Sequence, residues 1–501
     1  MIRALPGVLS AALVLLLTLG TLAAVFLRAD VGSGLSAADW AAIRFTVSQA
    51  VISALLSVLF AVPVARALAR RQFRGRGALI TLLGAPFLLP VIVAVIGLLA
   101  VFGRNGIVND VLGLFGWNVS IYGFHGVVLA HVFFNLPLAT RLILQGWLAI
   151  PAERFRLAAT LNASVWRMLE WPMLRLVAPG AFLVIFLICL TSFAVALTLG
   201  GGPRATTVEL AIYQALRFDF DLGRAALLSC IQFGLCVVAA LVVWRMSIVD
   251  AMGAGLDRVV QRWDLNRPIW DYGMIACAAL FLLLPLGMVV LQGLPGLFEL
   301  PQSIWAAALR SILVAVGSAF LCAGMSLALA LRGGALVAVI GVLPLAASGL
   351  VVGTGAFLIV FPFVRPADVA LIVTMLANAT LALPFALRAI ASAVADVQAD
   401  FGRLAQSLRL TGWAWLRIVV LPRVRRPLGF GAGLAAALSM GDLGVITLFA
   451  GQAQETLPLA MYRLMGAYRM DAAAGAALVL VGLSLALFWI FDRGGRANVD
   501  M

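Results

Sequence analysis

The chain has 501 residues, of which 64% are hydrophobic and only 11% are charged, and its mean hydropathy is +1.11. This balance excludes an ordinary soluble domain, in which about a quarter of the residues are charged. The formal charge of +14 could suggest nucleic-acid binding, but the Arg residues lie in short segments between apolar runs rather than on one soluble face. The sequence therefore predicts a protein embedded in lipid.

Apolar runs of about 20 residues, the length of a helix that crosses a bilayer, recur along the whole chain. In chain order we predict twelve spans, at 8–27, 45–65, 78–103, 124–145, 176–200, 225–244, 272–293, 306–331, 335–363, 369–390, 428–450 and 472–491. The Cys residues lie within apolar stretches without paired spacing, which predicts neither disulfides nor metal ligands. The expected fold is an all-α membrane protein with about twelve transmembrane helices.

The Arg residues set the orientation of these spans. With the N-terminus inside, basic clusters follow the second and the tenth spans on the cytoplasmic side, at Arg66, Arg70, Arg71, Arg74 and Arg76 and at Arg403, Arg409, Arg417, Arg423, Arg425 and Arg426. An excess of Arg in cytoplasmic loops is the usual pattern of membrane proteins. We therefore expect a multi-pass protein with both termini in the cytoplasm.

The second part of the chain repeats the first. A spacing of 247 residues relates His131 to Asn378, Pro137 to Pro384, Arg141 to Arg388, Arg156 to Arg403 and Trp166 to Trp413, and one of 249 relates Thr207 to Thr456 and Tyr213 to Tyr462. Chance similarity between Ala-rich and Leu-rich helices is the alternative, but it would not align Pro, Arg, Trp and Tyr in one order. With six spans each, the two halves enter the membrane in the same direction, as a parallel repeat.

This repeat divides the chain into a first permease-like half at 1–244, a linker at 245–268 and a second half at 269–501. The linker carries both Arg and Asp residues, such as Asp257 and Arg258, which is typical of a solvated segment. A parallel repeat implies a pseudo-twofold axis along the membrane normal, with a pathway between the halves.

The cytoplasmic segments 151–172 and 397–422 follow the fourth span of each half. Both carry leucines four residues apart, which share one face of a helix: Leu157 and Leu161, and Leu404 and Leu408. Ala158 and Ala405, beside these leucines, would leave room for a close partner surface. The pattern predicts two short docking helices; ordinary amphipathic helices at the membrane surface are the alternative.

These segments resemble the cytoplasmic loop of the integral membrane subunits of bacterial ABC importers, which reads E-A-A, three residues, G and later L-P. In that family the loop forms a coupling helix that sits in a groove of the ATPase. The matching residues are Arg156, Leu157, Ala158, Ala159 and Asn162, and Arg403, Leu404, Ala405, Gln406 and Arg409. The Glu of the pattern is Arg here in both halves, and its Gly is Asn162 or Arg409. The resemblance implies that these residues contact an ATPase, and it implies the MetI-like, type I permease fold.

Over nearly its full length the chain resembles the thiamine and thiamine pyrophosphate permeases of Gram-negative bacteria, through LAHVFFNLPLATRLILQ, SFAVALTLGGGPRATTVELAIYQAL and SMGDLGVITLF. The resemblance implies ATP-driven import of thiamine, and of its phosphates, across the inner membrane by alternating access. It also implies an ATP-binding subunit dimer and a periplasmic thiamine-binding protein as partners, beside membrane lipid and without nucleic acid. A ferric iron permease of the same architecture is one alternative, and an ion-coupled secondary transporter is another.

The sequence predicts a transport subunit rather than an enzyme. It contains no Lys, so it lacks the loop ending in G-K-[ST] with which ATPases hold phosphates. Its two histidines, His125 and His131, are too far apart for an H-E-x-x-H zinc motif. We expect no catalytic residue, metal site or cofactor in this chain, and ATP and magnesium bound by the partner ATPase.

Asp442 is a carboxylate inside a predicted span, with apolar flanks in ALSMGDLGVITLF. A charge in lipid is costly unless it faces protein or water, so we expect this side chain to face the interior. At a spacing of 249 its counterpart is Phe193. An acidic and an aromatic residue both attract organic cations, and the hypothesis is that Asp442 and Phe193 contact the cargo. A structural carboxylate bonded to a neighbouring helix is the alternative.

Overall fold

The computed structural model describes residues 5–30, 32, 34–84, 89–200, 202, 205–245 and 268–496. Within these ranges the chain is helical and contains no strand, which confirms the all-α prediction. Eleven of the described helical stretches are long and apolar enough to cross a membrane. The predicted linker 245–268 lies outside the described residues except for its two ends, Arg245 and Pro268.

The first half contains α1 (Leu5–Leu15), the π-helical η1 (Leu16–Gly20), α2 (Thr21–Arg28), α3 (Ala37–Arg70), α4 (Arg76–Leu82), α5 (Val91–Phe102), α6 (Ile107–Gly113), α7 (Phe124–Leu148), α8 (Ala152–Thr160), the π-helical η3 (Trp166–Glu170), α9 (Trp171–Leu190), α10 (Ala194–Leu199), α11 (Val208–Arg217) and α12 (Leu222–Trp244). The second half contains α13 (Pro268–Gly296), η5 (Leu297–Glu299), α14 (Gln302–Arg332), α15 (Ala335–Ala346), α16 (Gly349–Val360), α17 (Pro366–Ser407), α18 (Gly412–Ala414), the π-helical η6 (Trp415–Val420), α19 (Leu421–Met440), α20 (Gly444–Phe449), α21 (Leu457–Gly466) and α22 (Met470–Arg496).

The ninth predicted span, 335–363, is broken into α15 and α16, which accounts for eleven long stretches where twelve were predicted. The chain is extended at Ala347, and the Ser348 side chain accepts a hydrogen bond from the Val351 amide at 3.2 Å. This bond caps the start of α16, because it satisfies one of the free amides of the first turn. The break lies inside an apolar run, so hydropathy alone does not show it.

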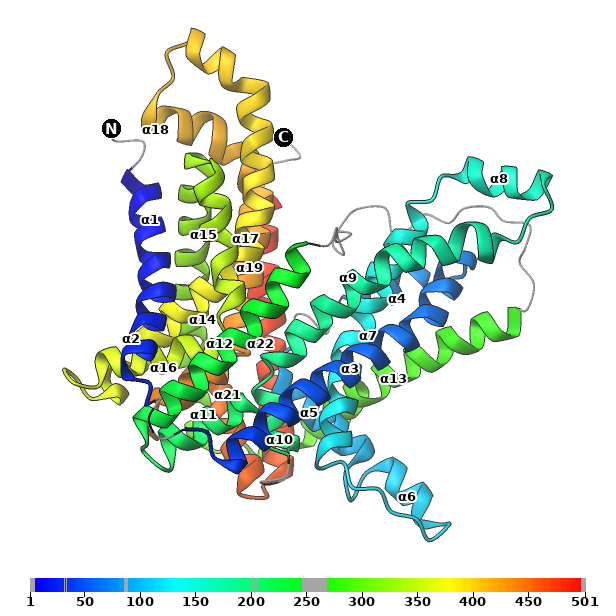
Figure 1. The fold of residues 1–501 in the computed structure, drawn as a ribbon, viewed down its shortest axis with the longest axis horizontal. Coiled ribbons are helices and arrows are strands. Elements are labelled where there is room, and N and C mark those ends of the chain that lie inside the picture. The colour runs from blue at the N-terminus through cyan, green and yellow to red at the C-terminus, as the bar shows by residue number, and fades with distance from the viewer. Residues whose placement is uncertain are drawn as a thin grey trace.

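The helices form two arms that diverge from a shared base (Figure 1). In one arm α3 packs against α7 and α9, and in the other α14 packs against α17 and α19, as expected for two copies of one unit. The free end of one arm carries α8, and the free end of the other carries the last turns of α17 with α18. The short helices α10, α11 and α21 lie at the base.

The first helices of each half pack against helices of the other half. The segment α1–α2 packs on α14 and α16, and α13 packs on α3 and α5. An ion pair fixes the second of these crossings, because Arg71 Nε lies 2.7 Å from Asp271 Oδ2 at the C-terminal end of α3. The two halves are therefore interlocked rather than placed side by side.

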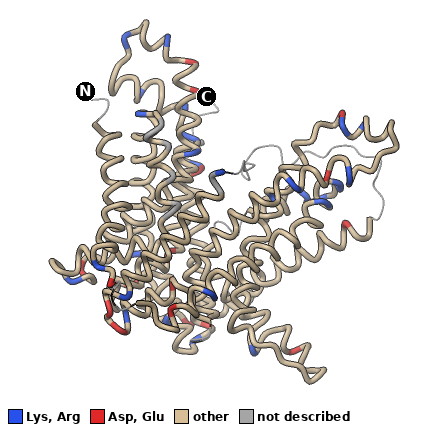
Figure 2. The backbone as a smooth tube through the Cα atoms, in the orientation of Figure 1, with Lys and Arg blue, Asp and Glu red and all other residues tan. Residues whose placement is uncertain are grey.

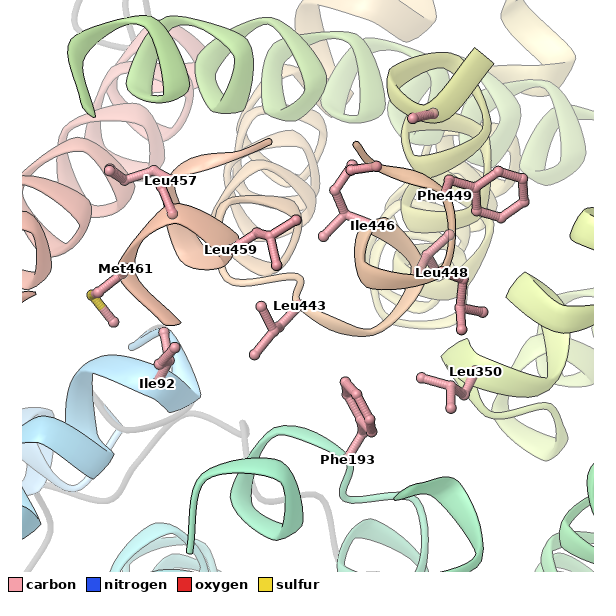
Figure 3. Packing of buried hydrophobic residues seen from close by; sticks show 14 of the residues in the cluster. Ile92, Phe193, Leu350, Leu443, Ile446, Leu448, Phe449, Leu457, Leu459 and Met461 are labelled. Carbon is pink, nitrogen blue, oxygen red and sulfur yellow. The ribbon is translucent and has the colours of Figure 1, made fainter. Parts of the chain in front are cut away.

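Buried residues of both halves pack together at the base, where Figure 3 shows Phe193 of the first half pointing toward Leu443 and Leu350 of the second. All three side chains are at most 6% exposed. Ile92 of α5 and Met461 of α21 belong to the same cluster. We call the contact of Phe193 with Leu350 and Leu443 the base seal. The structure is closed at this end, while the arms diverge toward α8 and α18.

Candidate coupling surfaces and translocation pathway

The predicted docking helix of the first half is present as α8, while that of the second half is the end of the 42-residue helix α17 rather than a separate helix. In both, the predicted leucines are exposed: Leu157 by 60%, Leu161 by 66%, Leu404 by 54% and Leu408 by 61%. Exposed leucines at the free ends of the arms, four residues apart, form two matching apolar faces. We call them the coupling faces.

Ala158 and Ala405 do not lie on the coupling faces. They are 5% and 6% exposed, and Ala158 packs into the core of its own half with Phe155 and Val165. These alanines therefore lie on the side of the helix that is buried within the chain, opposite the exposed leucines, and their contact with a partner stays a prediction. The other predicted coupling residues are exposed: Arg156, Ala159, Asn162, Arg403, Gln406 and Arg409.

Asn162 and Arg409 end the two docking helices with the same backbone geometry. Their φ angles are +47° and +53°, in the left-handed region. The amide of the next residue bonds back to Ala158 O at 2.9 Å in the first half and to Ala405 O at 2.8 Å in the second. This is the Schellman end of a helix, for which Gly is the preferred residue. Asn162 and Arg409, which stand at the Gly of the family pattern, thus take a conformation that Gly adopts freely.

Replacing Arg409 by Gly should stabilise the protein, because an L-residue pays roughly 1 kcal/mol for a left-handed backbone that Gly adopts freely. Asn tolerates this conformation better, so Asn162→Gly is expected to have a smaller effect. Scanning fluorimetry of the purified protein in detergent should show a rise on the order of 1 °C for Arg409→Gly and a fall for the β-branched Arg409→Val. A melting temperature unchanged in both Arg409 variants would contradict the proposed backbone strain at Arg409.

The three additional residues of the second loop lengthen its helix. The helical stretch before Pro172 starts at Val165, and the one before Pro422 starts at Gly412. Both starts lie three residues after the left-handed residue, so the turn itself is the same in both halves. The second arm therefore carries nearly one additional helical turn between its coupling face and the membrane.

An ion pair that sequence reasoning missed holds the first coupling segment to its arm. Glu170, which is 2% exposed, accepts a hydrogen bond from Arg66 Nε at 2.8 Å. Trp147 Nε1 donates to the carbonyl oxygen of Glu170 at 3.0 Å, and the Arg66 guanidinium lies over the Trp166 ring. The sequence does not single out this pair, because the segment 151–172 contains both Arg and Glu residues and the partner of Glu170 lies 104 residues away.

Asp442 and Phe193 occupy equivalent breaks, between α19 and α20 and between α9 and α10. Asp442 Oδ1 accepts hydrogen bonds from the amides of Gly444 at 3.1 Å and Val445 at 3.4 Å. Its Oδ2 is buried and has no hydrogen-bond partner among the described residues. The Phe193 ring, which is part of the base seal, also packs edge-to-face against the Tyr213 ring. The structure thus places both residues at the closed end; a role in cargo contact stays a prediction.

Two interlocked halves, a closed base and coupling faces at the free ends of both arms define the class of the protein: a two-half permease of the importer type. A comparison with models of protein families finds no match. Curated relatives are found over nearly the whole chain. The thiamine transport system permease protein ThiP of Salmonella typhimurium is 39% identical, covering 99% of this chain and 97% of that protein. The ThiP of Escherichia coli is 39% identical over 92% of this chain, and that of Brucella abortus 38% over 99%.

The chain belongs to the family of thiamine transport system permease proteins. A shorter stretch, 36% of this chain, is 30% identical to the molybdenum transport system permease protein ModB of Azotobacter vinelandii. These relatives confirm the predicted ABC permease and its assignment as a transport subunit rather than an enzyme. With the apolar helices, they identify a multi-pass protein of the inner membrane.

Proposed function

We propose that this chain is the membrane pathway of an importer that moves thiamine, and also its phosphates, into the cytoplasm. The observation that supports it is the full-length relationship to thiamine permeases together with the paired coupling faces. A ferric iron cargo is not favoured, because the relatives that match nearly the whole chain are thiamine permeases.

The energy source in this proposal is a separate ATPase dimer, which binds ATP and magnesium and contacts both coupling faces. The exposed residues Arg156, Leu157, Arg403 and Leu404 would contact it first. A periplasmic thiamine-binding protein would deliver cargo at the base. In this proposal the free ends of the arms and both termini lie in the cytoplasm, which the many Arg residues at these ends in Figure 2 support.

The geometry supports alternating access by movement of the arms. Closure of the ATPase dimer would draw the coupling faces together, and rigid helices would carry this motion to the base. Because α17 is one helix from Pro366 to Ser407, it links its coupling face directly to the far side of the membrane. In the first arm, the pair of Arg66 with Glu170 ties the coupling segment to α3.

Uptake of labelled thiamine into cells that lack this chain, with and without the restored gene, tests the proposal. Labelled ferric iron is the control cargo. Restored thiamine uptake with unchanged iron uptake is the expected result. Restored uptake of iron alone would agree with an ABC permease but would contradict thiamine as its cargo.

A further inference from the structure

A cavity of about 250 Å³ lies between the two halves. The first half contributes His131 and Asn135 of α7 and Ser192, and the second half contributes Leu438 and Gly441 at the end of α19. Ser192 directly precedes Phe193, and Gly441 lies two residues before Leu443. The cavity therefore adjoins the base seal, where cargo would pass between the halves.

The polar groups of this cavity are built into the core. His131 and Asn135 are each 3% exposed. His131 Nδ1 lies 3.4 Å from Ser53 Oγ, while its Nε2 is buried without a hydrogen-bond partner among the described residues. Asn135 Nδ2 donates to the His131 carbonyl oxygen at 2.8 Å, which fixes this amide beside the imidazole. A buried nitrogen without a hydrogen-bond partner destabilises the fold, so its presence requires an explanation.

The equivalent position of the second half shows that the fold does not require a buried polar atom without a partner, such as His131 Nε2. At the spacing of 247, Asn378 takes the place of His131. Its Nδ2 donates to Ser439 Oγ at 3.0 Å, and Ser439 Oγ donates to Ser318 Oγ at 3.1 Å. The equivalent network is thus closed within the protein. The free imidazole nitrogen belongs to the first half alone, on the wall of the cavity.

The wall chemistry indicates the class of ligand. Apolar residues, including the Phe134 ring, make up most of the wall, and the polar atoms come from His131, Asn135 and Ser192. A pocket near the lower limit of about 300 Å³ for ligand sites holds one small molecule. The carboxylate of Asp442, which follows the wall residue Gly441 without lining the cavity itself, favours a cation nearby. A bare metal ion fits poorly, since the described residues contain no cluster of three His, Cys, Asp or Glu.

We propose that this cavity is a binding site for the cargo on its way through the membrane, and that it takes a flat heteroaromatic cation. His131 and Asn135 hydrogen-bond to the ring nitrogens of the cargo, and Phe134 contacts its ring. The proposal rests on the proposed import of thiamine and names the residues that hold the molecule between the halves.

Labelling of a cysteine in the cavity tests binding directly. Ser192→Cys is introduced into the complete importer complex, in a chain with Cys230→Ser and Cys277→Ser, because these two native cysteines are not buried. A small methanethiosulfonate should react with it, and thiamine should slow that reaction roughly tenfold. Ser392→Cys, on an exposed position of α17, is the matched control and should react equally with and without thiamine.

Filling the cavity tests its role in transport. Leu138→Phe introduces the residue that stands at the equivalent position of the second half, Phe385, and should lower the kcat/KM of thiamine uptake at least tenfold. Phe385→Leu is the reciprocal control and should leave uptake nearly unchanged. His131→Leu should lower uptake roughly tenfold, the effect of one lost hydrogen bond of about 1.4 kcal/mol. Amounts of protein in the membrane are measured for every variant.

The outcomes separate the site from the function. Protection of Ser192→Cys by thiamine, with impaired uptake by Leu138→Phe at normal protein levels, supports the site. Thiamine import by the unchanged complex, without protection and with normal uptake by Leu138→Phe, overturns the site and leaves the function standing. An unchanged complex that imports no thiamine overturns both. Since the labelling does not depend on His131, a failure of His131→Leu to fold does not affect it.

Discussion

Replacing both Leu157 and Leu404 by Asp is expected to abolish thiamine uptake and to release the ATPase subunit. Each leucine is more than half exposed, at the free end of an arm. Burial of a leucine against a partner contributes about 1.5–3 kcal/mol, and a carboxylate at the same place adds a desolvation cost. Losing two such contacts should weaken docking by roughly a hundredfold or more.

Copurification of the ATPase subunit with this chain is the primary measurement, with uptake as the second. Leu114→Asp is the matched control, since Leu114 is 83% exposed beside α6, at the opposite end of the molecule from α8. It should leave both measurements unchanged. Normal copurification of the double variant would show that the coupling faces do not carry the ATPase.

The sequence was sufficient for those parts of the fold that follow from composition and repetition. Apolar length predicts the spans, and the recurring Pro137 and Pro384 reveal two copies of one unit. The leucine spacing also located the coupling faces, because residues four apart share a side of any helix. These features depend on local patterns, which a single chain displays directly.

Hydropathy could not show where an apolar run breaks or which helix it meets. The division at Ser348 depends on one capping bond, and the breaks before Phe193 and Asp442 lie in equally apolar surroundings. In lipid, packing rather than amphipathic pattern decides which helices associate. The exchange of first helices between the halves was therefore not predictable, and neither was the inward position of Ala158.

The candidate site was only partly predictable for the same reason. Asp442 stood out as a charge, but His131 and Asn135 had no feature that distinguished a cavity wall from ordinary core. Only the comparison of the folded halves shows that the polar network is closed at Asn378 and open at His131. The difference between the two halves at these positions is visible in the sequence, but its effect on the cavity wall can be seen only when the helices are placed.

Gly355→Ala and Gly97→Ala are each expected to disrupt the interlocking of the halves. Both glycines are the seventh residue of their helices, α16 and α5, and each faces the first helix of the other half. A Cβ atom at Gly355 would lie 2.2 Å from the Thr21 carbonyl oxygen, and one at Gly97 2.5 Å from the Pro285 carbonyl oxygen. Because the obstacle is backbone, a whole helix must move to admit a single methyl group.

Overpacking of this kind costs about 1–3 kcal/mol, and more where backbone must shift. The expected result is a several-fold lower yield of monodisperse protein and a lower melting temperature in detergent. Gly324→Ala in α14 and Gly234→Ala in α12 are the controls, since nothing lies within 4 Å of a Cβ at either position. On propensity alone, Ala in a helix should stabilise all four variants. A stabilised Gly355→Ala protein would therefore contradict the close crossing of α2 over α16.

An equal loss of stability in Gly355→Ala and Gly97→Ala would also bear on how the arms move. If α2 and α13 are held as closely as these glycines allow, each moves with the arm of the other half rather than with its own. Arm movement then cannot separate the halves as free bodies; it must pivot around two crossings at symmetric positions. A disulfide between the crossing helices, which locks α2 to α16, should accordingly leave thiamine uptake intact. Loss of uptake in the locked protein, restored by a reductant, would show instead that the first helices slide during transport.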